Sequence, residues 1–260
     1  MQTRTLTLNN GMPLQFDHAP RETGLPTLVL IHGWTCRRSY WKPQVEHLND
    51  RYPLLVPDLP GHGDSPAWQE TPASIDGLAD CLVELITHQV TGPAILLGHS
   101  MGGAVALKAA QQLGNVARGV ILADTFVIDY GGLDAETQDT LYQTFADDFS
   151  GGMHWLIDNT SVEQTPESLR NRLKQEMAEA DPAWALPLWK TLLAWQPDET
   201  FPAVRCPIRA INGKLVPMTA RKRCKPFLNE VVMPRAGHFL QMEDPIGFNR
   251  LLDEALADLT

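Results

Sequence analysis

The chain has 260 residues, of which 43% are hydrophobic and 20% are charged, and its formal net charge is −10. This composition is ordinary for a globular domain with a substantial core. The acidic balance excludes a general electrostatic affinity for nucleic acid or for an anionic membrane surface.

The N-terminal half of the chain alternates strand-like and helix-like segments. Residues 3–10 and 12–19 alternate apolar and polar side chains around the turn signal Asn9-Asn10-Gly11, so they predict an antiparallel hairpin at a sheet edge. Nearly continuous apolar runs predict buried strands at residues 27–33, 53–58, 94–97 and 116–124, with helices at 40–49, 73–89 and 104–110. This order predicts a parallel sheet with helices on both faces.

The pattern changes after residue 125. Residues 126–200 carry helical patterns and four of the seven tryptophans, without a clear buried strand. Strand-like runs return at 207–213 and 230–237, and an amphipathic helix closes the chain. We therefore expect a core domain formed by residues 1–125 and 201–260, with residues 126–200 as a helical cap over the carboxyl edge of the sheet, where open α/β sheets bind ligands.

The stretch Gly98-His99-Ser100-Met101-Gly102 fits the pattern G-x-S-x-G between a predicted strand and a predicted helix. A serine in such a tight turn needs neighbours without bulk, and two glycines flank it. The turn lifts the hydroxyl above the sheet, close to a helix N-terminus that favours negative charge. Ser100 is therefore the candidate nucleophile.

A serine hydroxyl is a poor nucleophile without a base. His238 is the best candidate, because it follows the last predicted strand and Gly237 suits a loop that turns the ring back over the sheet. His99 lies inside the serine turn, where a packing role is expected.

With these motifs the chain resembles the α/β-hydrolase superfamily along nearly its whole length. His32-Gly33-Trp34 looks like the family's oxyanion loop, and Asp58–Ser65 looks like its D-x-P-G-x-G-x-S turn. The resemblance implies a mostly parallel sheet of about eight strands flanked by helices. It also implies an oxyanion hole made by the backbone N–H groups of Trp34 and Met101.

The chain departs from the family at the triad acid. The resemblance implies an acid after the seventh strand, where this chain has Val216, which cannot orient a histidine ring. Asp124, which ends the predicted sixth strand, is the expected replacement. The chain order Ser100, Asp124, His238 then still follows the family's order of serine, acid and histidine. Asp129 and Glu230 remain the alternatives.

The sequence thus predicts a serine hydrolase that cleaves a carboxylic ester or lactone of a small molecule through an acyl-enzyme. The aromatic composition of residues 126–200 favours an apolar or aromatic acyl group. The expected pocket residues are His32, Phe126, Trp155 and Trp189, with His32 also holding its loop. The same scaffold leaves open a carbon–carbon bond hydrolase, a cofactor-free ring-cleaving dioxygenase and a non-catalytic ligand-binding protein.

Several expectations concern what the chain lacks. No dinucleotide motif and no metal-ligand spacing is present, so neither cofactor nor metal is expected. The unpaired spacing of four cysteines, together with the lack of an apolar leader or span, predicts a cytoplasmic protein, and the oligomeric state stays open. The one basic cluster, Arg221 to Lys225, is interpreted as a solvated helix face.

Overall fold

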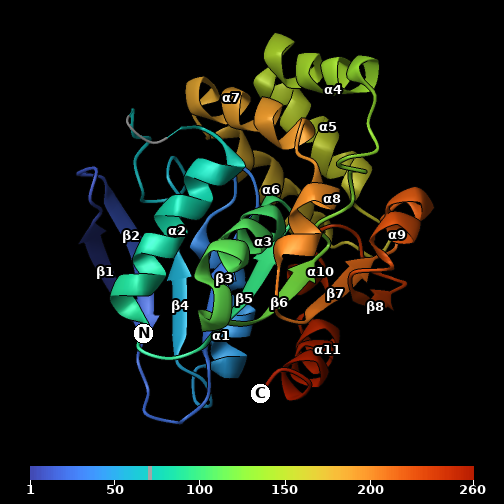
Figure 1. The fold of residues 1–260 in the computed structure, drawn as a ribbon. Coiled ribbons are helices and arrows are strands. Elements are labelled where there is room, and N and C mark those ends of the chain that lie inside the picture. The colour runs from blue at the N-terminus through green and yellow to red at the C-terminus, as the bar shows by residue number, and fades with distance from the viewer. Residues whose placement is uncertain (70–71) are drawn as a thin grey trace.

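The centre of the molecule is an eight-stranded sheet, seen in a computed structural model that describes residues 1–69 and 72–260 (Figure 1). The strands are β1 (Gln2–Thr7), β2 (Pro13–Ala19), β3 (Thr27–Ile31), β4 (Leu54–Pro57), β5 (Ala94–His99), β6 (Ala117–Ala123), β7 (Ile208–Gly213) and β8 (Asn229–Met233). Their order is β1-β2-β4-β3-β5-β6-β7-β8. The first two pairings are antiparallel and the others are parallel, which confirms the predicted mostly parallel sheet with a hairpin at one edge.

Helices cover both faces of this sheet, which explains why the central strands carry apolar side chains on both faces. Successive side chains of a strand point to opposite faces. Val29 and Ile31 of β3 accordingly join the core under α2 (Ile75–Gln89) and α3 (Met101–Leu113). Leu28 and Leu30 join a second core with α1 (Lys42–Leu48) and α11 (Pro245–Ala257).

The remaining helices lie mostly between β6 and β7. They are α4 (Ala135–Asp147), α5 (Phe149–Thr160), α6 (Glu167–Ala178), α7 (Pro182–Leu193) and α8 (Pro197–Thr200), with α9 (Met218–Cys224) and α10 (Leu240–Glu243) later in the chain. Short 3-10 turns occur at Arg38–Trp41, Gly114–Val116 and Phe201–Ala203. Among the described residues, no helix is both long and apolar enough to cross a bilayer.

Residues 126–200, all of them described, form helices and contribute no strand to the sheet. We call this stretch the helical segment. In Figure 1 its helices α4, α5 and α7 lie above the edge of the sheet toward which the arrow of β4 points. That edge carries the carboxyl ends of the parallel strands, so the helical segment covers the place where loops from β3, β5, β6 and β8 meet.

Candidate active site

Ser100 occupies a strained turn between β5 and α3. Its φ of 53° and ψ of −124° lie outside the regions that L-residues ordinarily adopt. Close contacts surround the turn: a Cβ at Gly98 would lie 2.2 Å from the carbonyl oxygen of Gly102, and a Cβ at Gly102 would lie 2.4 Å from that of Ile31. Both positions therefore require glycine, which accounts for the G-x-S-x-G pattern.

His238 lies between Ser100 and Asp124 on the loop that follows β8. The Ser100 hydroxyl is 3.1 Å from Nε2 of His238, and Nδ1 of His238 is 2.7 Å from Oδ2 of Asp124. A carboxylate can only accept, so Nδ1–H donates to Asp124 and Nε2 is left to accept from Ser100. The histidine backbone is also held, because its N–H donates to the carbonyl of Thr160 at 2.9 Å and its carbonyl accepts from Nε2 of His99 at 2.9 Å.

Asp124 directly follows β6 and is completely buried. Its backbone N–H donates to the carbonyl of Ile211 at 3.0 Å, which ties it to the end of β7. Its carboxylate accepts from two sides, from the backbone N–H of Gly213 at 2.6 Å and from His238. Both carboxylate oxygens are thus occupied and the orientation of the group is set. Val216, at the position where the family resemblance implied the acid, is buried beside another cavity.

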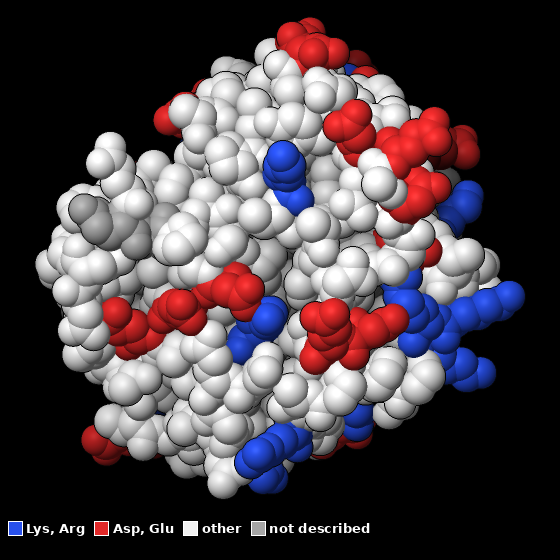
Figure 2. All heavy atoms as spheres, turned by 45° about the horizontal axis from the view of Figure 1, so that its top comes forward, with Lys and Arg blue, Asp and Glu red and all other residues white. Residues whose placement is uncertain are grey.

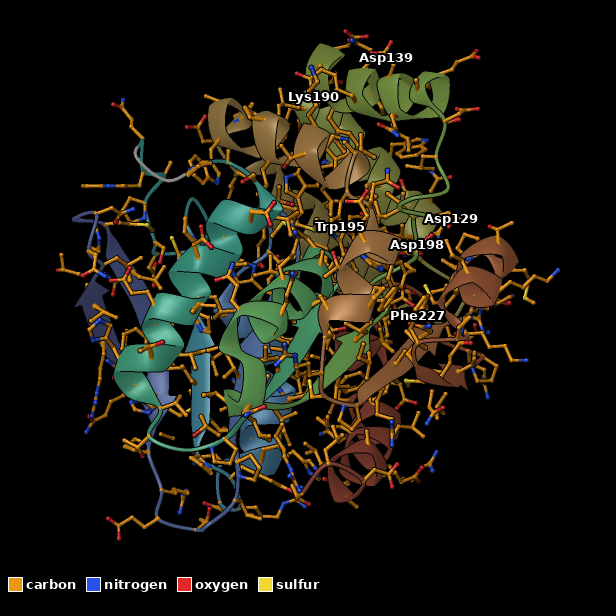
Figure 3. The ribbon with its side chains drawn as sticks, in the orientation of Figure 1. Asp129, Asp139, Lys190, Trp195, Asp198 and Phe227 are labelled. Carbon is orange, nitrogen blue, oxygen red and sulfur yellow. The ribbon has the colours of Figure 1, made fainter. Side chains whose placement is uncertain are left out.

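The two alternative acids have other partners. Asp129 accepts from the guanidinium of Arg223, and Figure 3 shows it on the side of the molecule that carries Asp198. Glu230 accepts from Nδ2 of Asn212 at 2.7 Å and pairs with Arg221 at 3.1 Å. The structure therefore brings Asp124, and neither Asp129 nor Glu230, into contact with His238.

The backbone segments that carry the two expected oxyanion donors lie close to Ser100. Met101 is the first residue of α3, so its N–H has no partner within the helix. The loop that carries Trp34 passes very close, since a Cβ at Gly33 would lie 3.1 Å from the Cβ of Ser100. Both backbone segments are therefore near Ser100.

The side chain of Trp34 joins this loop to the helical segment. Its indole N–H donates to the carbonyl of Ala185 in α7 at 3.0 Å. Its ring stacks on that of Trp189, also in α7, with 4.5 Å between centroids and 18° between planes. The position of Trp34 therefore depends on where α7 lies.

The cavity beside Ser100 is very small, about 20 Å³. That volume holds roughly one water molecule. The residues around it are Trp34, Cys36, His99, Ser100, Val127, Ile128, Tyr130, Leu156, Met177, Trp189, Leu192, His238 and Phe239. The side chains that border it are mainly apolar, and Asp, Glu, Lys and Arg do not occur among these residues.

Only one of the four expected pocket residues, Trp189, borders this cavity. Phe126 packs instead against Trp195, with 6.0 Å between ring centroids. Trp155 is 43% exposed on α5. His32 is enclosed in its own loop, where Nδ1–H donates to the carbonyl of Gly33 and Nε2 accepts from a backbone N–H. Aromatic composition alone does not tell which side of a helix faces the cavity.

Other lining residues were not anticipated from the sequence. Val127, Ile128 and Tyr130 follow β6, and Phe239 follows His238, so their nearness in sequence to Asp124 and His238 was an available signal. Leu156, Met177 and Leu192 come from three different helices, and no local pattern brings them together.

Three further histidines near the site are buried and uncharged at neutral pH. Burial lowers the pKa of His32 to about 4 and, with the neighbouring His32, that of His62 to about 3. Burial and the nearby His238 lower the pKa of His99 well below its usual value. Within the described ranges, 1–69 and 72–260, His, Cys, Asp and Glu form no group of three that could hold a metal ion.

The arrangement can be compared with known proteins. The sequence model of the Alpha/beta hydrolase family matches residues 28–251. A pimeloyl-[acyl-carrier protein] methyl ester esterase of Methylococcus capsulatus is 37% identical over 129 residues, which are 48% of this chain and 47% of that protein. The magnesium-chelatase 30 kDa subunit of Rhodobacter capsulatus is 38% identical over 85 residues, 33% of this chain and 30% of that protein. These matches span less than half of either curated relative.

Solved structures extend the comparison to the whole chain. A thermophilic esterase from Thermogutta terrifontis, solved with malate bound, is 26% identical with a TM-score of 0.82, covering 100% of this chain and 99% of that one. The family match covers most of the chain, and the sheet order and the strand–turn–helix at Ser100 agree with it. The chain belongs to the alpha/beta hydrolase family.

Proposed function

We propose that the protein is a serine hydrolase that cleaves a carboxylic ester or lactone through an acyl-enzyme. The observation that carries the proposal is the continuous hydrogen-bonded chain from Ser100 through His238 to Asp124, at 3.1 and 2.7 Å. The Ser100 oxygen attacks the carbonyl carbon while Nε2 of His238 takes its proton. His238 then gives that proton to the departing alcohol oxygen, and water repeats the sequence to release the acid.

Asp124 has the role of holding the histidine in the reactive tautomer. With Nδ1–H committed to the carboxylate, Nε2 is free to accept the serine proton. The buried negative charge also stabilises the imidazolium that forms in the transition state.

The backbone N–H groups of Trp34 and Met101 are the proposed oxyanion hole. Negative charge develops on the attacked carbonyl oxygen, and fixed donors stabilise it without reorganising. The N-terminal end of α3 adds a favourable helix dipole at the same place.

The substrate is proposed to be a small, neutral molecule with an apolar or aromatic acyl part. The lining side chains Ile128, Leu156, Met177 and Leu192 are apolar, so they would not compensate a buried charge on the acyl group. Because the cavity holds only about one water molecule, the helical segment must shift to admit substrate, which is the behaviour of a cap. The methyl ester esterase among the relatives supports the ester class.

The cellular setting is part of the same proposal. In the described part of the chain Cys36, Cys206 and Cys224 are free thiols, and Cys36 and Cys224 are buried. Unlinked thiols are typical of a reducing compartment, which supports a cytoplasmic location.

The test is hydrolysis of p-nitrophenyl esters of increasing acyl length by the wild type and by Ser100→Ala. We expect turnover by the wild type and a loss in kcat on the order of 10⁴–10⁶ for the variant. Ser168→Ala is the control, because Ser168 is exposed on α6 and does not border the cavity beside Ser100. Full activity of Ser100→Ala in a correctly folded protein would contradict the mechanism. A wild type that hydrolyses no ester would move the proposal to carbon–carbon hydrolysis or to oxygen-dependent ring cleavage.

A further inference from the structure

A second cavity lies between α9 and the strands β7 and β8, apart from the triad. Its volume is about 640 Å³, compared with about 20 Å³ beside Ser100. Neither Ser100 nor His238 lines it. Small-molecule sites commonly measure about 300–1,000 Å³, so this cavity has the size of a ligand site.

The cavity is positively charged in a protein whose net charge is −10. Arg221, Lys222 and Lys225 line it, against the single carboxylate of Glu230. Arg221 is engaged by Glu230 at 3.1 Å. Lys222 and Lys225 are exposed, and over the described part of the chain no carboxylate lies within ion-pair distance of either ammonium group. Figure 2 shows a continuous group of Lys and Arg side chains at the right of the molecule, where Figure 1 places α9.

Asn212 lines the same cavity, and its side chain has an unsatisfied acceptor. The residue is only 4% exposed, and its Nδ2 donates to Glu230 at 2.7 Å. A carboxylate can only accept, so this bond fixes the amide orientation and leaves Oδ1 as the remaining polar atom. Oδ1 is buried and has no hydrogen-bond partner among residues 1–69 and 72–260. A buried acceptor without a partner costs free energy that a ligand donor would recover.

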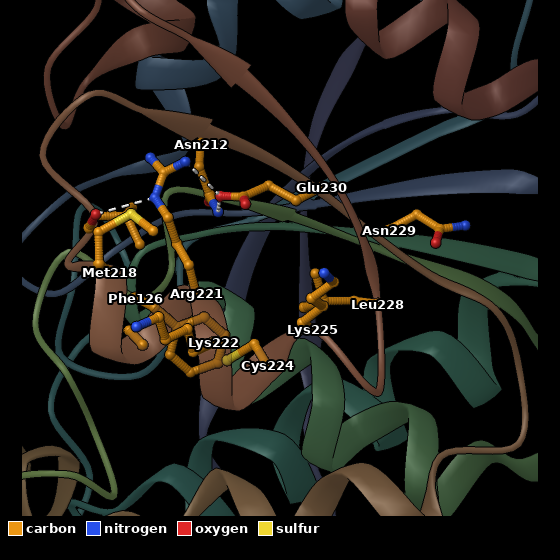
Figure 4. A pocket seen from close by; sticks show the side chains of 12 residues that line it. Phe126, Asn212, Met218, Arg221, Lys222, Cys224, Lys225, Leu228, Asn229 and Glu230 are labelled. Carbon is orange, nitrogen blue, oxygen red and sulfur yellow. Dashed lines mark hydrogen bonds and ion pairs between the residues drawn. The ribbon is translucent and has the colours of Figure 1, made fainter.

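The rest of the lining is apolar. Phe126, Val216 and Leu228 contribute carbon surface. Figure 4 shows Asn212, Arg221 and Glu230 together on one side of the cavity, with Phe126, Lys222 and Lys225 on the others. The cavity therefore combines cationic side chains and an apolar wall, and one of its lining residues, Asn212, carries an unfilled acceptor.

We propose that this cavity is a second, non-catalytic binding site for a small amphipathic hydroxycarboxylate. The carboxylate pairs with the ammonium groups of Lys222 and Lys225, the hydroxyl donates to Oδ1 of Asn212, and the carbon chain lies on Phe126 and Leu228. The basic cluster, interpreted from sequence as a solvated helix face, then also forms the rim of a binding site.

The site borders the peptide group that orients Asp124. Gly213 follows Asn212, its N–H donates to Asp124 at 2.6 Å, and its carbonyl accepts from Arg221 at 2.9 Å. The binding proposal itself does not depend on the hydrolase proposal, because its test measures binding and not turnover.

The test is isothermal titration calorimetry of the intact protein with ω-hydroxyhexanoate, hexanoate and hexanol. We expect the hydroxylated acid to bind about fivefold more tightly than hexanoate, because it fills the acceptor of Asn212, and hexanol to give no binding. If neither acid bound at concentrations up to about 10 mM, the proposal would be overturned. A Kd of about 10 mM corresponds to a binding free energy of about −3 kcal/mol.

Variants locate the site. The double variant Lys222→Gln with Lys225→Gln should lower the affinity for both acids at least tenfold. The control double variant Lys42→Gln with Lys174→Gln removes the same charge elsewhere and should leave the affinity unchanged. Asn212→Ala should abolish the preference for the hydroxylated acid. Since the two lysines are exposed, their variant folds even if Asn212→Ala does not. Unchanged binding by the lysine variant would place the ligand elsewhere and overturn the assignment.

Discussion

Backbone strain marks the same residues that the chemistry selects. Thr35, Ser100 and Asp124 are the non-glycine residues with positive φ in the described part of the chain, at 55°, 53° and 49°. Such a conformation costs about 1–3 kcal/mol and persists only where the surroundings enforce it. The carboxylate of Asp124 and the hydroxyl of Ser100 both contact His238, and Thr35 follows Trp34 in the oxyanion loop. The strain is thus concentrated where nucleophile, acid and oxyanion loop converge.

The contacts of Asp124 predict the result of Asp124→Asn. The N–H of Gly213 would keep the amide oxygen on its side, so the amide NH₂ would face Nδ1 of His238. Nδ1 must then accept, Nε2 carries the proton, and the serine proton has no acceptor. We expect kcat for ester hydrolysis to fall by about 10⁴ with little change in KM. Steady-state kinetics measure this.

The matched control for this prediction is Asp129→Asn, which removes a carboxylate that Arg223 binds and His238 does not contact. It should retain wild-type kcat. If Asp129→Asn lost activity and Asp124→Asn kept it, the acid would have been assigned to the wrong residue.

Helix α7 packs on the loops above the sheet through two tryptophans that have different neighbours. Trp189 borders the triad cavity and stacks on Trp34, whereas Trp184 packs over the turn at Gly61, where a Cβ would meet its indole nitrogen at 2.0 Å. One helix thus sets both the space above Ser100 and the contact to the Asp58–Ser65 turn. The two side chains allow these roles to be separated.

Replacement of Trp189 by leucine should enlarge the acyl cavity. We expect kcat/KM for long-chain esters to rise about tenfold relative to acetate, since the lost ring volume lies beside the nucleophile. The free energy of unfolding should fall by about 3 kcal/mol, as for other large-to-small core changes. Acyl-chain profiles and urea unfolding measure the two effects.

Trp184→Leu removes a similar volume from the same helix outside the triad cavity. It should lower the free energy of unfolding while leaving the acyl-length preference unchanged. Equal shifts in preference for both variants would show that the effect comes from loosening α7 and not from the added space.

At the scale of the whole molecule, buried neutral histidines link stability to pH. His32 and His62 have folded pKa values of about 4 and about 3, below the ordinary 6.5 of the unfolded chain, and His99 is lowered as well. At a pH between its folded and its unfolded pKa, each of these histidines binds a proton in the unfolded chain but not in the folded protein. Lowering the pH therefore favours unfolding, and the stability is complete above about pH 7.5.

We expect the free energy of unfolding to fall by about 2 kcal/mol for each of His32 and His62 between pH 7.5 and pH 5. Urea unfolding at several pH values measures the slope. In His62→Asn the slope of the free energy of unfolding against pH should fall by the amount that corresponds to one bound proton. In Gln111→Asn, which replaces an exposed residue that does not titrate, the slope should stay as in the wild type. An unchanged slope in His62→Asn would refute the link to buried histidines.

Much of the fold was predictable because its signals are local. Continuous apolar runs mark strands covered on both sides, and the glycines around Ser100 are required by contacts within the turn itself. Asp124 could be selected by strand order, since neighbouring parallel strands end at the same edge. The pocket was not predictable in this way: Trp189 borders the cavity, whereas Phe126 and Trp155 do not.

The sequence established the sheet class, the strained serine turn and the candidate base, because each depends on residues adjacent in the chain. Through the order of strands it favoured Asp124 among three candidate acids. Only the tertiary structure decided which carboxylate contacts His238, how nearly the helical segment closes the site, and that α9 borders a second cavity. These outcomes depend on side-chain packing between elements far apart in sequence. Trp34 and Ala185, joined by one hydrogen bond, are an example.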